Sequence, residues 1–568
     1  MRVRIISIAI ISVALMVVVR LGYIQILRGD EFALAANRQY SRPHSDEFSR
    51  GSIYFLEKSG NRVSAATLID TYYLVIDPSM VNDPDKYYTA LQQYISIDRQ
   101  VFLSRASKVD DNYEVIEREL EKSMADEINV LNLSGVYIYT EKKRYYPGGS
   151  LGSTLLGFVG KSADRGDRIF GRAGLEQYYE DVLTRTDGNL YINFFAEIFS
   201  NISSVFNDGY GSDLDGSIVL TVEPTVQRQL EEALSKAKSV WNSDTLGGII
   251  IEPETGRVIA MSSYPNFDPN EYNMVTNPEA FMNINIEGIY EMGSTIKPLA
   301  MASGIDAGVI TPETVYNDAG SIVIDKKRIS NYDGRARGET TMLEVLKQSL
   351  NLGVVYVEQK LGNRKFAEYM TSYGFGKKTG IDLPGESVGL IGNLSSDRDV
   401  NYVTAAFGQG IAVTPIQMAS ALSTLANGGR LIRPHVVDRI EYRLGIVDST
   451  ESVIGVRVLS KETAETVTEM LVKVVDEALI GGRAKMDHYS IAAKTGTAQM
   501  VNPETKEYYN DRYLHSFFGY FPASEPRYLI FLFHVNPKGA DYASATLTEP
   551  FMDLTKFLIN YYSIPPDR

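Results

Sequence analysis

Residues 291–298 read Glu-Met-Gly-Ser-Thr-Ile-Lys-Pro, a stretch that places a serine and a lysine three positions apart, at Ser294 and Lys297. Residues three apart on a helix lie on one face, so the two side chains can meet. Pro298 removes a backbone donor, which a helix tolerates only near its beginning. We therefore predict that a helix begins here, with Ser294 where free N–H groups and the helix dipole favour a developing negative charge.

A serine hydroxyl is a weak nucleophile at neutral pH and needs a neighbouring base. Lys297 can be that base only if its pKa falls from ~10.4 to ~7, a change of about 4–5 kcal/mol in the relative stability of its two forms. Burial beside a second cation can supply this change. Lys494 follows the strand-like run 491–493 and is the candidate for that cation.

Other parts of the chain show that such a serine–lysine pair alone is weak evidence. Ser235 and Lys238 have the same spacing but lie in a charged helical pattern, which predicts a solvated face. The motif Lys-Thr-Gly, which occurs at residues 494–496, also occurs at residues 378–380, but there it lies in a glycine-rich stretch that predicts a turn. Residues 148–152 fit the nucleophile-elbow pattern of α/β-hydrolases, but no buried strand precedes them, so a glycine-rich turn is the better interpretation.

Two further motifs, which follow in a fixed order, give the first pair its weight. Ser349-Leu350-Asn351 comes next in the chain, and Lys494-Thr495-Gly496-Thr497 comes last. With Ser294 and Lys297 they match the S-x-x-K, S-x-N and K-T-G set of serine acyl-enzymes. We therefore predict that three segments far apart in sequence converge on one site.

Strand patterns occur at both ends of the segment that carries these motifs. They lie at residues 248–251, 257–262, 490–499, 517–521 and 528–535. The first two predict a hairpin, and the residues between the two groups have mostly helical periods. One such helix covers 341–349, and its Thr341 and Glu344 predict a capping box. The expected architecture is α/β, one antiparallel sheet with a helical insertion.

The overall composition excludes several classes of function. A chain of 568 residues predicts two or three domains, and its net charge of −15 argues against a nucleic acid as the main partner. The absence of cysteine excludes disulfides, cysteine-ligated zinc and a thiol nucleophile. The five histidines show no metal-binding spacing, so we expect no metal site.

The N-terminal region predicts export. Residues 5–19 carry no charged or amide side chain, and the apolar run continues to Leu27 with Arg20 inside it, which makes it long enough for a membrane span. Arg2 and Arg4 favour a cytoplasmic N-terminus. The alternative is a cleaved signal peptide with a site at 33–35, but that site lies far beyond the apolar run.

The region after this run mixes short elements. Strand-like runs cover 72–76 and 190–194, a charged helical stretch covers 114–127, and no constellation of catalytic character is present. The polar, turn-rich residues 207–213 predict a domain boundary.

With its S-x-x-K, S-x-N and K-T-G motifs in this order, the chain resembles the class B penicillin-binding proteins. Residues 255–261, 265–270 and 407–415 look like family sequence in the catalytic part, and Arg50-Gly51, Tyr146-Pro147 and Gly174-Leu175-Glu176 look like pieces of the family's non-catalytic pedestal. The chain departs from the family at three places. They are Met292 in place of proline, Ala493 in place of glycine, and residues 56–60 in place of the usual D-R-N-G turn.

The resemblance implies a domain order and a cellular location. Residues 1–27 would be a cytoplasmic stub and transmembrane anchor, residues 28–214 an elongated α+β pedestal of the dimerisation type, and residues 215–568 the transpeptidase domain of the penicillin-binding and serine β-lactamase-like fold. The protein would be a single-pass protein of the bacterial inner (plasma) membrane, with its catalytic domain outside the cytoplasm. Its partners would be a polytopic membrane glycosyltransferase and other cell-wall synthesis and division proteins.

The resemblance also implies a reaction, the D,D-transpeptidation that cross-links the D-Ala-D-Ala stem peptides of peptidoglycan. Ser294 would attack the carbonyl between the terminal D-alanines, Lys297 would be the base, and Ser349 would relay a proton to the leaving amine. β-Lactams would inhibit it covalently, and no metal or cofactor would be needed. Asn351 and the stretch 518–522 look more like division-type than elongation-type members.

Substrate binding would fall to the remaining motif residues. Asn351 would hold the peptide backbone of the substrate, and Lys494 and Thr495 its terminal carboxylate, on a strand that continues through Gly496. The backbone N–H groups of Ser294 and Thr497 would form the oxyanion hole.

Two other functions are compatible with this sequence. A D,D-carboxypeptidase or β-lactamase would use the same chemistry, but the long pedestal and the anchor argue against a simple hydrolase. A membrane scaffold or β-lactam sensor would keep the fold without turnover, but the intact Ser294, Lys297, Ser349 and Lys494 argue against a silent protein.

Overall fold

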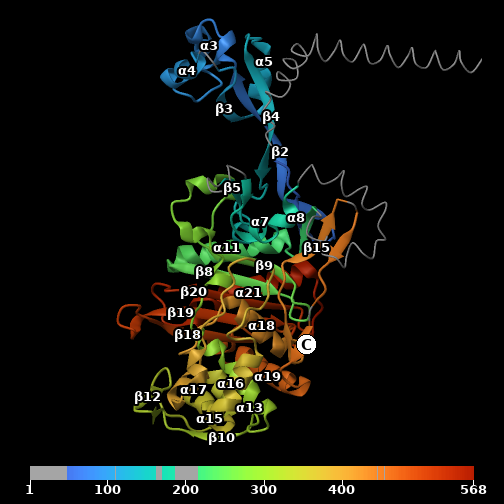
Figure 1. Cartoon of the computed structure of the whole chain (residues 1–568). Helices are drawn as coiled ribbons and strands as arrows, with labels where there is room; N and C mark the ends of the chain where they lie inside the picture. Colours follow the sequence, from blue (N-terminus) through green and yellow to red (C-terminus); the bar gives the residue numbers. More distant parts are fainter. Residues whose placement is uncertain (1–47, 109–110, 162–168, 186–214, 444, 453) are drawn as a thin grey trace, which may run out of the picture. The chain divides into compact units, whose positions relative to one another are not determined.

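The computed structural model describes residues 48–108, 111–161, 169–185, 215–443, 445–452 and 454–568. They form two compact units (Figure 1): one contains residues 70–143, and the other contains residues 50–69 and 144–568. The predicted anchor at 1–27, the signal-peptide alternative at 33–35 and the strand at 190–194 lie outside the described residues. Among the helices in the described ranges, none has both the length and the apolar character needed to cross a bilayer.

The smaller unit packs three helices on strands. The end of β2 (Arg62–Ile76) pairs with β3 (Glu114–Leu120), and α3 (Pro84–Leu91), α4 (Arg99–Ala106) and α5 (Lys122–Val130) belong to the same unit. Its core contains buried side chains from strands and helices, among them Leu74, Leu91, Phe102, Ile116 and Ile128.

The prediction of a helix over residues 114–127 is wrong in its first half. Residues 114–120 form β3, and the helix begins only at Lys122. Pairing with β2 places Leu120 opposite Tyr72 and Val115 opposite Val75. The strand buries Ile116 and Leu120 in the core of the unit, so tertiary pairing overrides the local helical preference.

The larger unit is built on a five-stranded antiparallel sheet, as the strand patterns predicted. Its order is β18 (Ala492–Val501), β19 (Tyr508–Phe521), β20 (Tyr528–Val535), β8 (Thr245–Ile251) and β9 (Val258–Tyr264). β8 and β9 form the predicted hairpin. The three C-terminal strands extend the sheet from β8, which pairs with β20. β18, which carries the K-T-G motif, is therefore an edge strand of this sheet.

Helices cover both faces of the sheet (Figure 1). On one face α11 (Pro224–Trp241) and α21 (Thr548–Tyr562) contribute to a core with Phe517 and Ile530. On the other face lies α18 (Pro415–Ala426), all of whose residues are buried.

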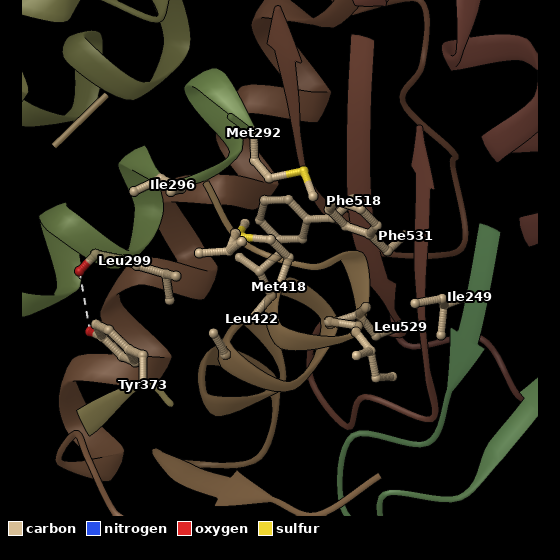
Figure 2. Close-up of a cluster of buried hydrophobic side chains, with 14 of the residues drawn as sticks. Ile249, Met292, Ile296, Leu299, Tyr373, Met418, Leu422, Phe518, Leu529 and Phe531 are labelled. Carbon is tan, nitrogen blue, oxygen red and sulfur yellow. Dashed lines mark hydrogen bonds between the residues drawn. The ribbon is translucent and has the colours of Figure 1, made fainter. Parts of the chain in front are cut away.

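Figure 2 shows what α18 holds together. Met418 and Leu422 of this helix lie between Phe518 and Leu529 of the sheet on one side and Met292, Ile296 and Leu299 on the other. The last three residues belong to the helical insertion, which includes α13 (Lys297–Asp306), α14 (Met342–Gln348) and α15 (Asn351–Leu361). One continuous core therefore links the sheet to the segment around Ser294.

The helix predicted at 341–349 is α14, and its capping differs in one detail. Thr341 is the N-cap and accepts a hydrogen bond from the backbone N–H of Glu344 at 3.3 Å. The Glu344 carboxylate does not complete the box, since it accepts hydrogen bonds from Lys347 at 2.6 Å and Gln348 at 2.9 Å. A charged partner within reach on the helix competes for the carboxylate.

A second sheet joins the beginning of the larger unit to its later parts. β1 (Ile53–Leu56) pairs in parallel with β7 (Gly216–Leu220), which pairs with β15 (Val437–Tyr442). Residues on both sides of the boundary predicted at 214 thus share one compact unit. The boundary itself stays a prediction.

The three pedestal stretches meet in one buried cluster of charges. Glu176, which is fully buried, accepts hydrogen bonds from Arg50 at 2.5 Å, from Arg144 at 2.6 Å and from the Tyr146 hydroxyl at 3.1 Å. Arg144 also donates to the carbonyl oxygen of Gly51 at 2.8 Å. Burial opposes the ionisation of Glu176, but Arg144 and Arg50 outweigh it and hold the pKa of this carboxyl below its usual range.

We predict that Glu176→Gln lowers the free energy of unfolding by about 3–5 kcal/mol, because it leaves the buried guanidinium of Arg144 without its counter-charge and removes one of the two carboxylates that Arg50 pairs with, the other being Glu180. Urea denaturation at neutral pH measures the change. Because the folded-state pKa is depressed, this stabilisation is present above the ordinary pKa of 4.5 and is lost as the pH falls below it.

Arg364→Ala is the control for this measurement. It removes an exposed ion pair with Glu368, so the free energy of unfolding should change by less than about 0.5 kcal/mol. Equal effects of the two substitutions would contradict the structural role of the cluster.

Candidate active site

Ser294 lies in a short turn at the start of a helix, as predicted. The turn is the 3-10 segment η7 (Gly293–Thr295), and α13 begins two residues later, at Lys297. Pro298 occupies the first turn of α13, where its missing N–H leaves no helical hydrogen bond unmade. Ser294 therefore lies in the turn just before α13, and Lys297 is the first residue of that helix.

Close backbone contacts fix this turn against the sheet and a neighbouring loop. Gly293 has a φ of 59°, and a Cβ atom there would lie 2.8 Å from the carbonyl oxygen of Thr497. Its N–H donates to the carbonyl oxygen of Gly408 at 3.1 Å, and the Ser516 hydroxyl donates to that of Met292 at 2.9 Å. The backbone before the nucleophile therefore lies directly on β18 and β19.

Lys297 is completely buried, and its amine points at Ser349. Lys297 Nζ donates to the carbonyl oxygen of Ser349 at 2.6 Å and lies 3.3 Å from its hydroxyl. Ser349 is the C-cap of α14 and has left-handed backbone angles, φ 56° and ψ 43°. This strained conformation turns the chain between α14 and α15 at the point where the serine faces the lysine.

Lys494 approaches the same hydroxyl from the sheet. It lies on β18, is 3% exposed, and its Nζ donates to Ser349 Oγ at 2.9 Å and to the carbonyl oxygen of Thr495 at 2.9 Å. The Ser349 hydroxyl thus lies within hydrogen-bond reach of both lysines. Side chains from α13, from β18 and from the turn between α14 and α15 meet here, which is the convergence that the sequence predicted.

The two lysines are perturbed in the same direction. Burial, and then the charge of Lys494, lowers the pKa of Lys297 well below its usual range. Burial lowers the pKa of Lys494 to about 7. Among the described residues, neither lysine has a carboxylate as a hydrogen-bond partner. Lys297 has the additional repulsion, so it is the lysine that loses its proton first.

A cleft of about 870 Å³ opens in front of this cluster. Of the predicted site residues, its lining contains Ser294, Ser349, Asn351, Lys494, Thr495 and Thr497. Lys297 and Gly496 lie behind this surface and are buried. Asn351 Nδ2 donates to the carbonyl oxygen of Ser330 at 2.9 Å, and Thr497 Oγ1 accepts from the N–H of Ala543 at 3.1 Å. No group of three metal-ligating side chains occurs in the described part of the chain.

Several residues of this site gave no signal in the sequence. Ser516 ties the nucleophile turn to the sheet, since its hydroxyl donates to the carbonyl oxygen of Met292 at 2.9 Å. Within the turn, Thr295 Oγ1 donates to the same oxygen at 2.9 Å and lies 3.3 Å from Ser516 Oγ. Glu291 accepts hydrogen bonds from the Tyr508 hydroxyl at 2.9 Å and from the N–H of Gly410 at 2.8 Å. These contacts join distant segments, and no local pattern announces them.

The two departures near the site are accommodated by packing. Met292 is fully buried in the core shown in Figure 2. Ala493 lies opposite Gly519 on β19, where a Cβ atom at 519 would come within 2.8 Å of the Ala493 methyl group. The glycine at position 519 therefore leaves room for the larger residue at 493.

The competing motifs lie where the sequence placed them. Ser235 and Lys238 are on α11, and Ser235 is exposed. Residues 378–380 form no helix or strand. Neither belongs to the lining of the cleft.

The sequence matches two family models. Residues 247–555 match the penicillin binding protein transpeptidase domain, and residues 47–197 match the penicillin-binding protein dimerisation domain. Together the two models cover most of the chain, and the dimerisation model precedes the transpeptidase model.

Similar proteins agree with these matches. Stage V sporulation protein D of Bacillus subtilis (strain 168) is 30% identical over 550 residues, which cover 95% of this chain and 82% of that protein. Peptidoglycan D,D-transpeptidase FtsI of Escherichia coli (strain K12) is 25% identical over 562 residues, which cover 96% and 90%. Penicillin binding protein 3 from Mycobacterium tuberculosis, solved in its apo form, shares the fold with a TM-score of 0.68 at 24% identity, over 92% of this chain and 98% of that chain. The chain therefore belongs to the class B penicillin-binding proteins of the division type, with a dimerisation domain followed by a transpeptidase domain.

Proposed function

We propose that this protein is a peptidoglycan D,D-transpeptidase that cross-links stem peptides during septal synthesis, through an acyl-enzyme on Ser294. The observation that carries the proposal is the position of the Ser349 hydroxyl, 3.3 Å from Lys297 Nζ and 2.9 Å from Lys494 Nζ. This arrangement joins a candidate base, a candidate proton relay and a candidate cation in one buried cluster beside Ser294.

Acylation begins with Ser294. Its Oγ attacks the carbonyl carbon between the two terminal D-alanines, while neutral Lys297 takes the hydroxyl proton. Burial and the neighbouring charge of Lys494 support this role, because they lower the pKa of Lys297. The C=O electron pair moves to oxygen, where the N–H groups of Ser294 and Thr497 hold it, each worth about 3–4 kcal/mol.

Ser349 serves the leaving group. When the tetrahedral intermediate collapses, the C–N bond breaks and the amine of the terminal D-alanine needs a proton. The Ser349 hydroxyl donates that proton and recovers one from Lys297, which lies 3.3 Å away. The acyl-enzyme then waits for the second substrate.

The amine of a neighbouring stem peptide completes the reaction. It attacks the acyl carbon, its proton passes to Lys297, and from Lys297 it returns to Ser294 Oγ as the ester bond breaks. A new peptide bond replaces the one that was cleaved, and the free enzyme is restored without a metal or a cofactor.

Substrate binding uses the wall of the cleft. Lys494 and Thr495 hold the terminal carboxylate, and Asn351 holds the peptide backbone. A bound carboxylate stabilises the charged form of Lys494, and that charge keeps Lys297 neutral, so binding prepares the base.

We extend the proposal to cellular context and to inhibitors. Residues 1–27 form a single-pass anchor in the inner (plasma) membrane, with the catalytic domain outside, and a polytopic membrane glycosyltransferase and other division proteins are the partners. The apolar run after Arg2 and Arg4 supports the anchor. β-Lactams are the covalent inhibitors, since the M. tuberculosis protein of similar fold has also been solved complexed with ampicillin.

The first prediction concerns the nucleophile. Ser294→Ala should abolish covalent labelling by a fluorescent penicillin, because it removes the proposed nucleophile, while the Ser349 hydroxyl near Lys297 has the role of a proton relay. Gel fluorescence after denaturation measures the labelling. Ser235→Ala is the matched control, since Ser235 has a lysine at the same spacing on the exposed face of α11, and its labelling should equal that of the unsubstituted chain. Labelling that survives Ser294→Ala would refute the assignment.

The second prediction separates transfer from hydrolysis. With two stem-peptide substrates, we expect cross-linked dimers whose yield rises with the concentration of the acceptor amine. Chromatography of the products measures them. Free D-alanine without dimers would establish a carboxypeptidase instead, and the absence of any turnover would establish a scaffold or sensor.

The third prediction concerns pH. Acylation should rise with pH as Lys297 loses its proton and fall above about pH 7 as Lys494 loses its charge, which gives a bell-shaped profile. In Lys494→Arg the guanidinium stays charged, so the alkaline decline should disappear, at a lower overall rate. Stopped-flow acylation by a penicillin measures both profiles. An unchanged alkaline decline in this variant would rule Lys494 out as its source.

A further inference from the structure

A buried polar network lies on the sheet face that packs against α20 (Ala543–Thr546) and α21. It joins Ser243, His515, His534 and Thr546, none of which is more than 1% exposed. Thr546 Oγ1 lies 2.9 Å from His515 Nδ1 and 2.8 Å from His534 Nε2. His534 Nδ1 lies 2.8 Å from Ser243 Oγ. The proposed reaction uses none of these groups.

The register of the sheet connects this network to the active site. His515 on β19 lies opposite Thr497 on β18 and opposite His534 on β20. Residues directly opposite each other in antiparallel strands project from the same face, so the three side chains form a row across the sheet. The row begins at the proposed oxyanion-hole residue and ends in the buried network.

A second connection runs through α20. Its first residue, Ala543, donates its N–H to Thr497 Oγ1 at 3.1 Å, and its last residue, Thr546, holds both histidines. The network, α20 and β18 therefore form a closed ring of contacts. Tyr542, Ala543 and Ser544 also line the cleft in front of Ser294.

We propose that His515, His534 and Thr546 are positioning residues for the acylation of Ser294, which hold Thr497 and the cleft wall 542–544 in place through α20. The proposal rests on the proposed function. The position of Thr497 affects the rate of acylation only if its backbone N–H stabilises the oxyanion formed when Ser294 attacks the substrate. None of the three residues touches the reacting atoms.

The protonation states fit this arrangement. Burial lowers the pKa of His515 to about 4, and burial together with the charge of His515 lowers that of His534 to about 3. Both rings are therefore neutral at neutral pH, and each has one donor and one acceptor nitrogen. The Thr546 hydroxyl has a single proton, so it can donate to one ring while it accepts from the other.

Thr546 is the position that tests the proposal most cleanly, because its hydroxyl is the group that both histidines share. Thr546→Val keeps the shape of the side chain and removes the hydroxyl, whereas Thr546→Ser keeps the hydroxyl and loses only a methyl group. The comparison uses the full-length protein in detergent, with two measurements: the rate of acylation by a fluorescent penicillin and the thermal unfolding of the same sample.

We expect Thr546→Val to acylate at least about tenfold more slowly at saturating penicillin, since small displacements of a site can cost about 10²-fold in rate. Thr546→Ser should stay within about threefold of the unsubstituted chain, since it keeps the shared hydrogen bonds. The rate is measured on folded protein well below the unfolding transition, so a loss of stability alone would leave it unchanged.

Two results would overturn the proposal: Thr546→Val acylating at the unsubstituted rate, whatever its stability, or Thr546→Ser losing as much rate as Thr546→Val. If Thr546→Val does not fold, His515→Asn and His515→Leu decide in the same assay. The asparagine amide carries both a donor and an acceptor, so it can replace the bond of Nδ1 to Thr546 and should preserve the rate that leucine lowers; equal rates would overturn the proposal. If these results overturn the positioning role, penicillin labelling still depends on Ser294. If the proposed function itself is wrong, labelling no longer depends on Ser294.

Discussion

The contact on which the site depends is the approach of two buried lysines to one hydroxyl. Two amines without a carboxylate partner repel each other when both are protonated, so the fold has to hold them together by packing. Lys297 is held by α13 and Lys494 by β18, and Ser349 lies between them on a strained turn. Burying the two amines together costs folding stability, and the same repulsion lowers the pKa of Lys297 so that its neutral form can act as a base.

The core around α18 supplies that packing. Figure 2 shows its side chains between the sheet and the segment before α13, so the distance between Lys494 and Lys297 is set by a layer of close-packed apolar residues. Backbone contacts add a second constraint, because Gly293 rests directly on Thr497. The pKa of Lys297 depends on its distance from the charge of Lys494, so a rigid core that fixes this distance also fixes the pKa.

The sequence predicted the local elements of this arrangement and the meeting of the three motifs, but it missed the contacts that depend on strand register. The hairpin strands, the start of α13 and the end of α14 each follow from periodicity or capping residues within a few positions. The meeting of Ser294, Ser349 and Lys494 followed from a known motif order. By contrast, His515 and His534 appeared as isolated histidines, and their shared partner Thr546 is recognisable only once the strand register is known. Likewise β3 appeared helical, because its pairing partner lies about 40 residues away in the chain.

The parallel pairing of β1 with β7 has a consequence for how the chain is made. A ribosome delivers β1 long before β7, and β15, which completes that part of the sheet, arrives later still. Strands that wait for distant partners raise the contact order and slow folding. During synthesis β1 can pair at once with β2, the next strand in the chain, but its other edge waits for β7. The five-stranded sheet of the larger unit waits longer, because β8 pairs with β20, which lies near the C-terminus, so this unit can close only when nearly all of the polypeptide has been made.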